Sequence, residues 1–183
     1  MLRKWLSQER TELANAIAQA VCNHVSTLNS QGIDFYGYAL LPGEPYEIKK
    51  CVAAFNCESD IKVNSEHDEY RYYRYGVDEW LDWLCDGFDS VNKLLEEANA
   101  SFHFLHLEDE DSYLIDEYKI LHSDALLEAT VRGLEIVKEN GVFGAKNPFL
   151  VVWISDSDHE IMNESVRRLN SEAVVRDFIA EFG

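Results

Sequence analysis

The sequence predicts an α+β fold, in which a small and mainly antiparallel sheet is packed with helices. Two runs rich in strand-forming residues are separated by a short turn, and one uninterrupted apolar run comes late in the chain. Elsewhere, apolar residues recur at helical spacing. Because the 183 residues include three prolines and no Ser/Gly-rich linker, we expect one domain that spans residues 1–183.

The N-terminal part of the chain is expected to form a helix followed by a hairpin. Apolar residues between Leu13 and Leu28 recur at helical spacing, which predicts a helix over about residues 5–29. Residues 33–41 and about 46–56 are rich in strand formers, and residues 42–45 contain two prolines and a glycine. Two strands joined by such a turn predict an antiparallel hairpin.

The middle of the chain is expected to begin with a second helix. Asp78 is suited to cap this helix, and Gly87 to kink or split it. The apolar stripe of this helix is expected to comprise Trp80, Leu81, Leu84, Phe88, Val91 and Leu95. Residues 102–107 are apolar apart from two histidines, and we expect them to form a short strand.

The C-terminal part is expected to contain helices around one strand. A helix is predicted over about residues 123–139, ended by the pair Asn140-Gly141. The continuous apolar run 149–154 predicts a central strand that is buried on both faces. Two short helices follow, and the first is expected to begin at Ser157, because Ser157 and Glu160 have the spacing of a capping box.

Negative charge is the strongest functional signal in the sequence. The chain carries a net charge of −18, and residues 76–118 hold thirteen Asp or Glu and one basic residue, Lys93, which gives this stretch −12. Such a field repels nucleic acid and anionic lipid and attracts cationic partners. We therefore expect a basic protein partner, no nucleic acid and no membrane. A solvated helix face that aids solubility, or adaptation to high salt, is the alternative.

Aromatic residues accompany this acidic stretch. Residues 70–75 interleave four tyrosines with Arg71 and Arg74, which we expect to pair with neighbouring carboxylates or to stack on tyrosine rings. The aromatic side chains then belong either to the core or to a protein-contact surface. The residues expected to bind a partner are Tyr72, Tyr73, Asp78, Glu79, Trp80, Asp82, Trp83, Asp86, Glu108, Asp109, Glu110 and Asp111.

One short motif has the residue types of a metal site. Asp156, Asp158 and Glu160 follow the apolar strand, and carboxylates at the end of a strand can hold Mg²⁺. The alternative is that they are the acidic first turn of a helix. His103, His106 and Glu108 are interpreted as surface residues rather than metal ligands.

The sequence contains neither a nucleophile motif nor a phosphate-binding loop, and we expect no cofactor. The four cysteines form no C-x-x-C pair and are expected to be reduced. An N-terminus broken by charges, and the absence of any long apolar stretch, predict a cytoplasmic protein.

Three segments together resemble a family of bacterial single-domain proteins known only as a domain of unknown function. The segments are residues 35–40 with 56–58, residues 73–75 with 78–80, and residues 153–158 followed by Ser165 and 169–170. Tyr75 departs from the pattern, in which a tryptophan is common. The resemblance implies a cytoplasmic α+β domain with no assigned activity, and a loose link to small acidic immunity proteins encoded beside bacterial toxins. It carries over no catalytic residue.

The leading hypothesis from the sequence is a non-enzymatic protein-binding domain, immunity-like in the sense above, that binds a cationic protein through its acidic surface. One alternative is a metal-dependent hydrolase or phosphotransfer enzyme that uses Asp156, Asp158 and Glu160 with Mg²⁺. A second alternative is a structural subunit of a homo-oligomer. The sequence leaves the oligomeric state open.

Overall fold

The computed structural model describes residues 2–84, 86–103, 105 and 112–183. It contains a four-stranded sheet in the order β3-β2-β1-β4, formed by β1 (Phe35–Leu41), β2 (Val52–Cys57), β3 (Asp82–Leu84) and β4 (Phe149–Val152). The pairs β1–β2 and β2–β3 are antiparallel, whereas β1–β4 is parallel. The α+β fold and the mainly antiparallel sheet are thus confirmed.

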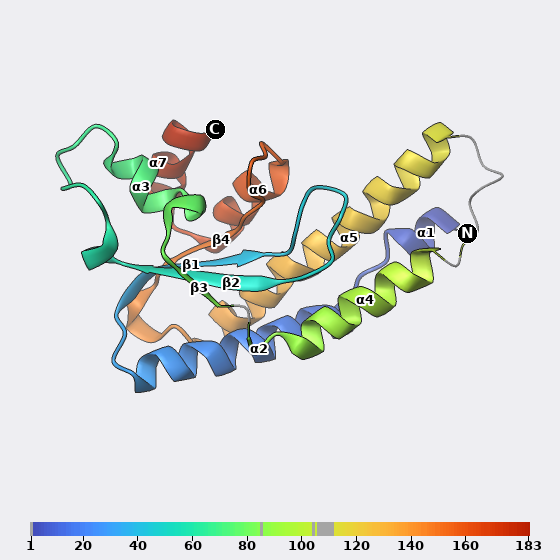
Figure 1. Ribbon diagram of the computed structural model, residues 1–183, viewed down its shortest axis with the longest axis horizontal. Helices are drawn as coiled ribbons and strands as arrows, with labels where there is room; N and C mark the ends of the chain where they lie inside the picture. Colours follow the sequence, from blue (N-terminus) through green and yellow to red (C-terminus); the bar gives the residue numbers. More distant parts are fainter. Residues whose placement is uncertain (1, 85, 104, 106–111) are drawn as a thin grey trace.

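Helices lie on both sides of this sheet (Figure 1). On one side are α2 (Thr11–Ser30), α4 (Asp89–His103) and α5 (Ser112–Glu139), with α1 (Leu2–Leu6) beside α5. On the other side are α3 (Tyr70–Tyr75), α6 (Glu160–Leu169) and α7 (Glu172–Phe182). The crossing of α2 and α5 is close because Gly133 has no side chain: a Cβ there would lie 2.5 Å from Cγ2 of Ile17.

Several element boundaries differ from the expected ones. The first helix is interrupted at residues 7–10, so it divides into α1 and α2. The second strand begins at Val52 rather than near residue 46, and residues 42–51 form a loop. Side chains of α4 hold the backbone of this loop: Asn92 Oδ1 accepts from Cys51 N at 2.8 Å, and Asn99 Nδ2 donates to Ile48 O at 2.9 Å.

The helix expected from Asp78 onward is wrong. Residues 77–79 form a short 3-10 turn (η2, Val77–Glu79), β3 follows, and α4 begins only at Asp89. Gly87 adopts a φ of +86°, a left-handed conformation that ends the segment between strand and helix. The strand expected over 102–107 is also wrong where it is described, because Phe102 and His103 belong to α4, while residues 104, 106 and 107 lie outside the described part.

The third predicted helix, α5, begins at Ser112 rather than near residue 123. It ends as expected at Glu139, before Gly141 with its φ of +67°.

The first of the two C-terminal helices, α6, begins at Glu160 and not at Ser157. Its N-terminal cap is His159, whose Nδ1 accepts from Ile161 N at 3.2 Å, while Ser157 Oγ accepts from His159 N at 3.1 Å.

The last strand, β4, is buried on both faces as expected, but it lies at the end of the sheet and not in its centre. Side chains satisfy its outer edge. Asn170 Oδ1 accepts from Leu150 N at 2.9 Å, and Asn170 Nδ2 donates to Leu150 O at 2.7 Å. Ser165 Oγ accepts from Val152 N at 3.1 Å. These contacts take the place of a neighbouring strand.

We therefore expect Asn170→Ala to lower the free energy of unfolding by about 1–3 kcal/mol, because it leaves buried backbone groups of Leu150 without partners. Urea unfolding followed by circular dichroism measures the change. Asn29→Ala, on the exposed side of α2, is the control and should change stability by less than about 0.5 kcal/mol. Equal effects of the two substitutions would contradict the role of Asn170 at this edge.

Candidate functional site

The segment that carries most of the predicted partner-binding residues is attached to the sheet by Trp80. This side chain is 3% exposed, and a Cβ on Gly37 would lie 2.7 Å from its Cη2 atom. The indole Nε1 donates to Arg74 O at 3.3 Å, and its ring meets Phe149 edge-on. Trp80 therefore belongs to the core and is not part of an exposed contact surface, which corrects its place among the expected partner-binding residues.

The two arginines of the Tyr/Arg segment are engaged within the fold, as expected. Arg74 stacks over Tyr36 at 4.2 Å from the ring centroid, and its Nη1 lies 2.6 Å from Glu58 Oε1. Arg71 Nη2 lies 3.4 Å from Asp177 Oδ1, so it links α3 to α7. Both guanidinium groups thus neutralise carboxylates of the same chain.

Two large apolar side chains of the β3 segment are exposed. Leu81 is 69% exposed and Trp83 is 43% exposed. The Nε1 of Trp83 donates to Trp80 O at 2.8 Å, so the buried tryptophan holds the exposed one in place. In the register of the sheet Trp83 lies opposite Ala54, and Asp82 lies opposite Phe55. Because successive strand residues point to opposite faces, Trp83 and Asp82 project from different faces of the sheet.

The predicted residues on α3 and η2 precede this segment in the chain, and a hydrogen bond joins the two elements. Tyr72 is 40% exposed, and its hydroxyl donates to Glu79 Oε1 at 3.2 Å. Lys62 Nζ lies 2.6 Å from Glu79 Oε2, and this hydrogen bond lowers the pKa of Glu79. Asp78 is exposed and accepts from Ser155 Oγ at 2.6 Å, whereas Tyr73 is half-buried.

The acidic stretch is not one uniform surface. In the described residues, the carboxylates of α4 and of the start of α5 include several that pair with lysine or arginine: Glu97 with Lys93, Asp116 with Lys119, and Glu117 with Arg3. Asp82 and Asp86 are exposed and form no ion pair with any described residue. Glu108, Asp109, Glu110 and Asp111 lie outside the described residues. Unneutralised charge therefore lies close to Trp83 along the chain, with Asp82 on the opposite face of the sheet.

We name the group formed by Leu81, Asp82, Trp83 and Asp86 the β3 surface. Residues 76–92 around it contain five acidic residues, Asp78, Glu79, Asp82, Asp86 and Asp89, and no basic one. The sequence signal that could have located this surface is the alternation of apolar and acidic residues at 81–83. The helical spacing of the apolar residues from Trp80 onward masks that signal, because it predicts one face of a helix.

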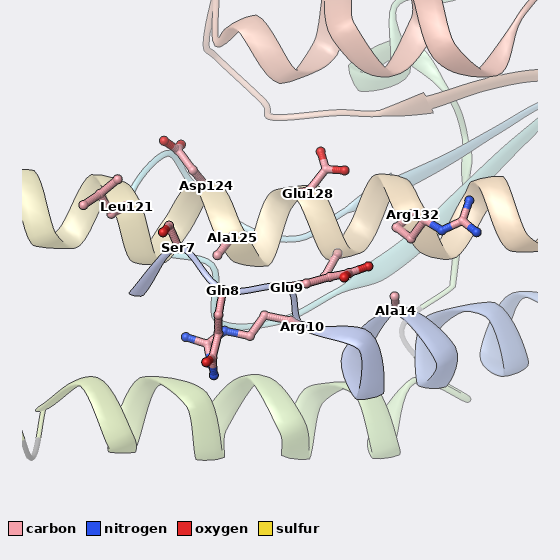
Figure 2. Close-up of a pocket in the computed structure, with 11 residues that line it drawn as sticks. Ser7, Gln8, Glu9, Arg10, Ala14, Leu121, Asp124, Ala125, Glu128 and Arg132 are labelled. Carbon is pink, nitrogen blue, oxygen red and sulfur yellow. The ribbon is translucent and has the colours of Figure 1, made fainter. Parts of the chain in front are cut away.

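A pocket that the sequence did not indicate lies between α5 and the connection from α1 to α2 (Figure 2). It has a volume of about 340 Å³, and its polar lining mixes Arg10 and Arg132 with Glu9, Asp124 and Glu128. The pocket depends on the break at residues 7–10, where a continuous helix was expected. Ser7, also in the lining, donates its hydroxyl to the backbone oxygen of Arg3 at 2.9 Å.

Two polar groups of the helical layer are removed from solvent to different degrees: Arg10, which lines the pocket, is half-buried, and His122 is buried. Arg10 extends toward α4 in Figure 2, lies 5.0 Å from the Trp5 ring centroid, and has a pKa that burial lowers. His122 is 3% exposed, stacks on Phe102 and donates from Nε2 to Asn99 Oδ1 at 3.2 Å. Burial, with the nearby charges of Arg10 and His103, lowers the pKa of His122 to about 4.

This pKa makes stability depend on pH. In the unfolded chain His122 binds a proton near pH 6.5, whereas in the folded chain it does so only near pH 4. Titration of His122 therefore leaves the free energy of unfolding unchanged above about pH 6.5 and lowers it as the pH drops toward 4. The full loss is about 3 kcal/mol.

We expect the stability of His122→Gln to fall less steeply than that of the natural chain between pH 6.5 and 4 in urea titrations. His67→Gln, at an exposed histidine, should keep the natural slope. If both variants show the same pH dependence, His122 is not the group responsible.

The turn before α6 and the first residue of that helix hold the three residues of the metal alternative. Asp156 has a φ of +53°, and the carboxylates of Asp156, Asp158 and Glu160 are exposed. Within the described residues, no group of three or more His, Cys, Asp or Glu side chains is placed to hold a metal ion. The hydrogen bonds of Ser157 and His159 instead give this turn the role of starting a helix. The hydrolase alternative gains no support from it.

Comparison with family models identifies the family of this chain. A model described as Domain of unknown function (DUF4303) matches residues 13–171, which include every strand of the sheet and the β3 surface. The chain belongs to the DUF4303 family. The description of DUF4303 names no activity and no link to toxin immunity. No curated protein and no solved structure matches the chain.

Residues that carried the family resemblance in the sequence have structural roles in this DUF4303 domain. Gly37 leaves room for the Trp80 ring, and Ser165 and Asn170 bond to the outer edge of β4.

In the part of the chain that is described, no helix combines the length and the apolar character that a bilayer crossing requires. The described cysteines, Cys22, Cys51 and Cys57, are free thiols.

We expect Gly37→Ala to destabilise the domain by about 1–3 kcal/mol, because the added methyl group overlaps the Trp80 ring. A double-mutant cycle with Trp80→Leu, measured by urea unfolding, isolates this contact. Gly37→Ala should lower the free energy of unfolding less in the Trp80→Leu background, where the indole ring is absent. If Gly37→Ala costs the same in both backgrounds, the Trp80 ring is not the source of the effect.

Proposed function

We propose that this DUF4303 domain is a non-enzymatic protein-binding domain that recognises a basic protein through the β3 surface. In this proposal Tyr72, Tyr73, Asp78 and Glu79, from the elements that precede β3 in the chain, extend the contact area. The free thiols fit a reducing compartment, and the proposal places the domain in the cytoplasm.

The observation that carries this proposal is the exposed, fixed indole of Trp83 next to Leu81. Single exposed apolar residues are common and need no explanation. Here two of them are two residues apart in the sequence, and the hydrogen bond from Trp83 Nε1 to Trp80 O restricts the ring before any partner binds. A side chain that is already ordered loses less conformational entropy on binding, and tryptophan is enriched among the residues that contribute most affinity.

The negative charge of the β3 surface determines which class of protein it selects as a partner. Asp82 and Asp86 have no cationic partner among the described residues, and the whole chain carries −18. Carboxylates at the rim of a contact accelerate association with a basic protein and repel an acidic one. An immunity-like role, in which the basic partner is a toxin, is one specific form of this proposal. Assembly of identical subunits through the β3 surface is disfavoured by the same charges.

The first test is a pull-down from a lysate of the source organism with four versions of the protein. They are the natural chain, Trp83→Ala, Asp82→Asn with Asp86→Asn, and Asp158→Asn with Glu160→Gln as a control that removes equal charge from the turn before α6. We expect one basic protein to be retained by the natural chain and by the control at low salt.

With that protein purified, Trp83→Ala should weaken binding about 30-fold, mainly through faster dissociation. The Asp82/Asp86 variant should slow association and flatten its dependence on salt up to about 0.5 M. Biosensor kinetics measure both effects. Retention of the same protein by all four versions, or binding that salt leaves unchanged, contradicts the proposal.

A further inference from the structure

The two edges of the sheet are treated differently by the rest of the chain. At the outer edge of β4, Asn170 and Ser165 bond to the backbone of Leu150 and Val152. At the outer edge of β3, no hydrogen bond from the described residues outside the sheet reaches the backbone of residues 82–84. The protein therefore closes one end of its sheet and leaves the other, next to the exposed Trp83, open.

We propose that the outer edge of β3 binds an extended segment of the basic partner, which adds to the sheet as a fifth strand. This inference rests on the proposed function and specifies how the contact is made. An unpaired edge presents backbone donors and acceptors in the direction of pairing, and strand addition uses them for affinity. The neighbouring side chains then select the sequence that is added.

The alternation of side chains on β3 specifies the character of that segment. Trp83 shares a face with Ala54, and Asp82 shares the other face with Phe55, whose ring contacts His24 of α2. A strand paired with β3 places its own side chains in the same alternation, with each lying beside a neighbour on the same face. The residue beside Trp83 is therefore apolar, and the residues beside Asp82 are Lys or Arg.

The charge of the chain excludes a second copy as the occupant. Edge-to-edge pairing of two β3 strands brings the acidic β3 surfaces of two copies together, and each copy carries −18. Like charges on paired strands are destabilising. A charged residue on an edge strand also protects against self-association. The same carboxylates that repel a copy attract a basic segment.

Peptides that alternate Lys and Val over nine residues, acetylated and amidated at their ends, provide the test. One version is unmodified, and two versions carry N-methyl groups on every second residue, on the valines or on the lysines, which removes backbone donors without changing charge. Isothermal titration measures the binding of each peptide to the full chain at low salt. We expect the unmodified peptide to bind and at least one methylated version to bind about tenfold more weakly.

A second measurement is amide hydrogen exchange of the protein, in which the unmodified peptide should slow exchange within residues 82–84. If all three peptides bind equally and Trp83→Ala weakens each of them, strand addition is wrong and the proposed function stands. If the unmodified peptide binds no better than an alternating Glu and Val peptide, both are contradicted.

Discussion

The contact of Trp80 with Gly37 is the constraint on which the candidate site depends. The indole lies directly against the backbone of β1, in space that any side chain at position 37 would occupy. From this fixed point the chain runs into β3, and the carbonyl of Trp80 accepts the hydrogen bond that orients the Trp83 ring. A buried tryptophan thus determines where an exposed one stands, so the position of the β3 surface is set by the core and not by a flexible loop.

The two outer edges of the sheet differ in how side chains of the same domain bond to their backbone groups. On β4, an amide and a hydroxyl side chain bond to the backbone N and O of Leu150 and to the backbone N of Val152, in place of an absent strand. These bonds favour burial of the strand on both faces, because they pair backbone groups that would otherwise be buried without partners. On β3, the edge is three residues long and carries the exposed Asp82 and Trp83. Acidic groups elsewhere, as in Glu79 with Lys62, are partly neutralised by cations of the same chain.

The sequence predicted most of the secondary structure and misplaced the segment that matters most for function. Apolar residues between Trp80 and Leu95 have helical spacing, yet they belong to a turn, a strand and a helix, and the positive φ of Gly87 separates the last two. The continuous apolar run of β4 correctly indicates that the strand is buried. It also predicts a central position, because hydrophobic periodicity does not reveal the polar side chains that bond to the outer edge of the strand. Exposure of Trp83, against burial of Trp80, depends on tertiary contacts that spacing does not encode.

The satisfied edge of β4 has a consequence for the stoichiometry of assembly. Head-to-tail growth of a sheet requires two free edges on every subunit, so that each copy both accepts a strand and offers one. Here Asn170 and Ser165 terminate one end within the chain itself. A complex formed at β3 is therefore complete with a single added segment, and the domain cannot propagate a sheet into an open-ended fibre through β4.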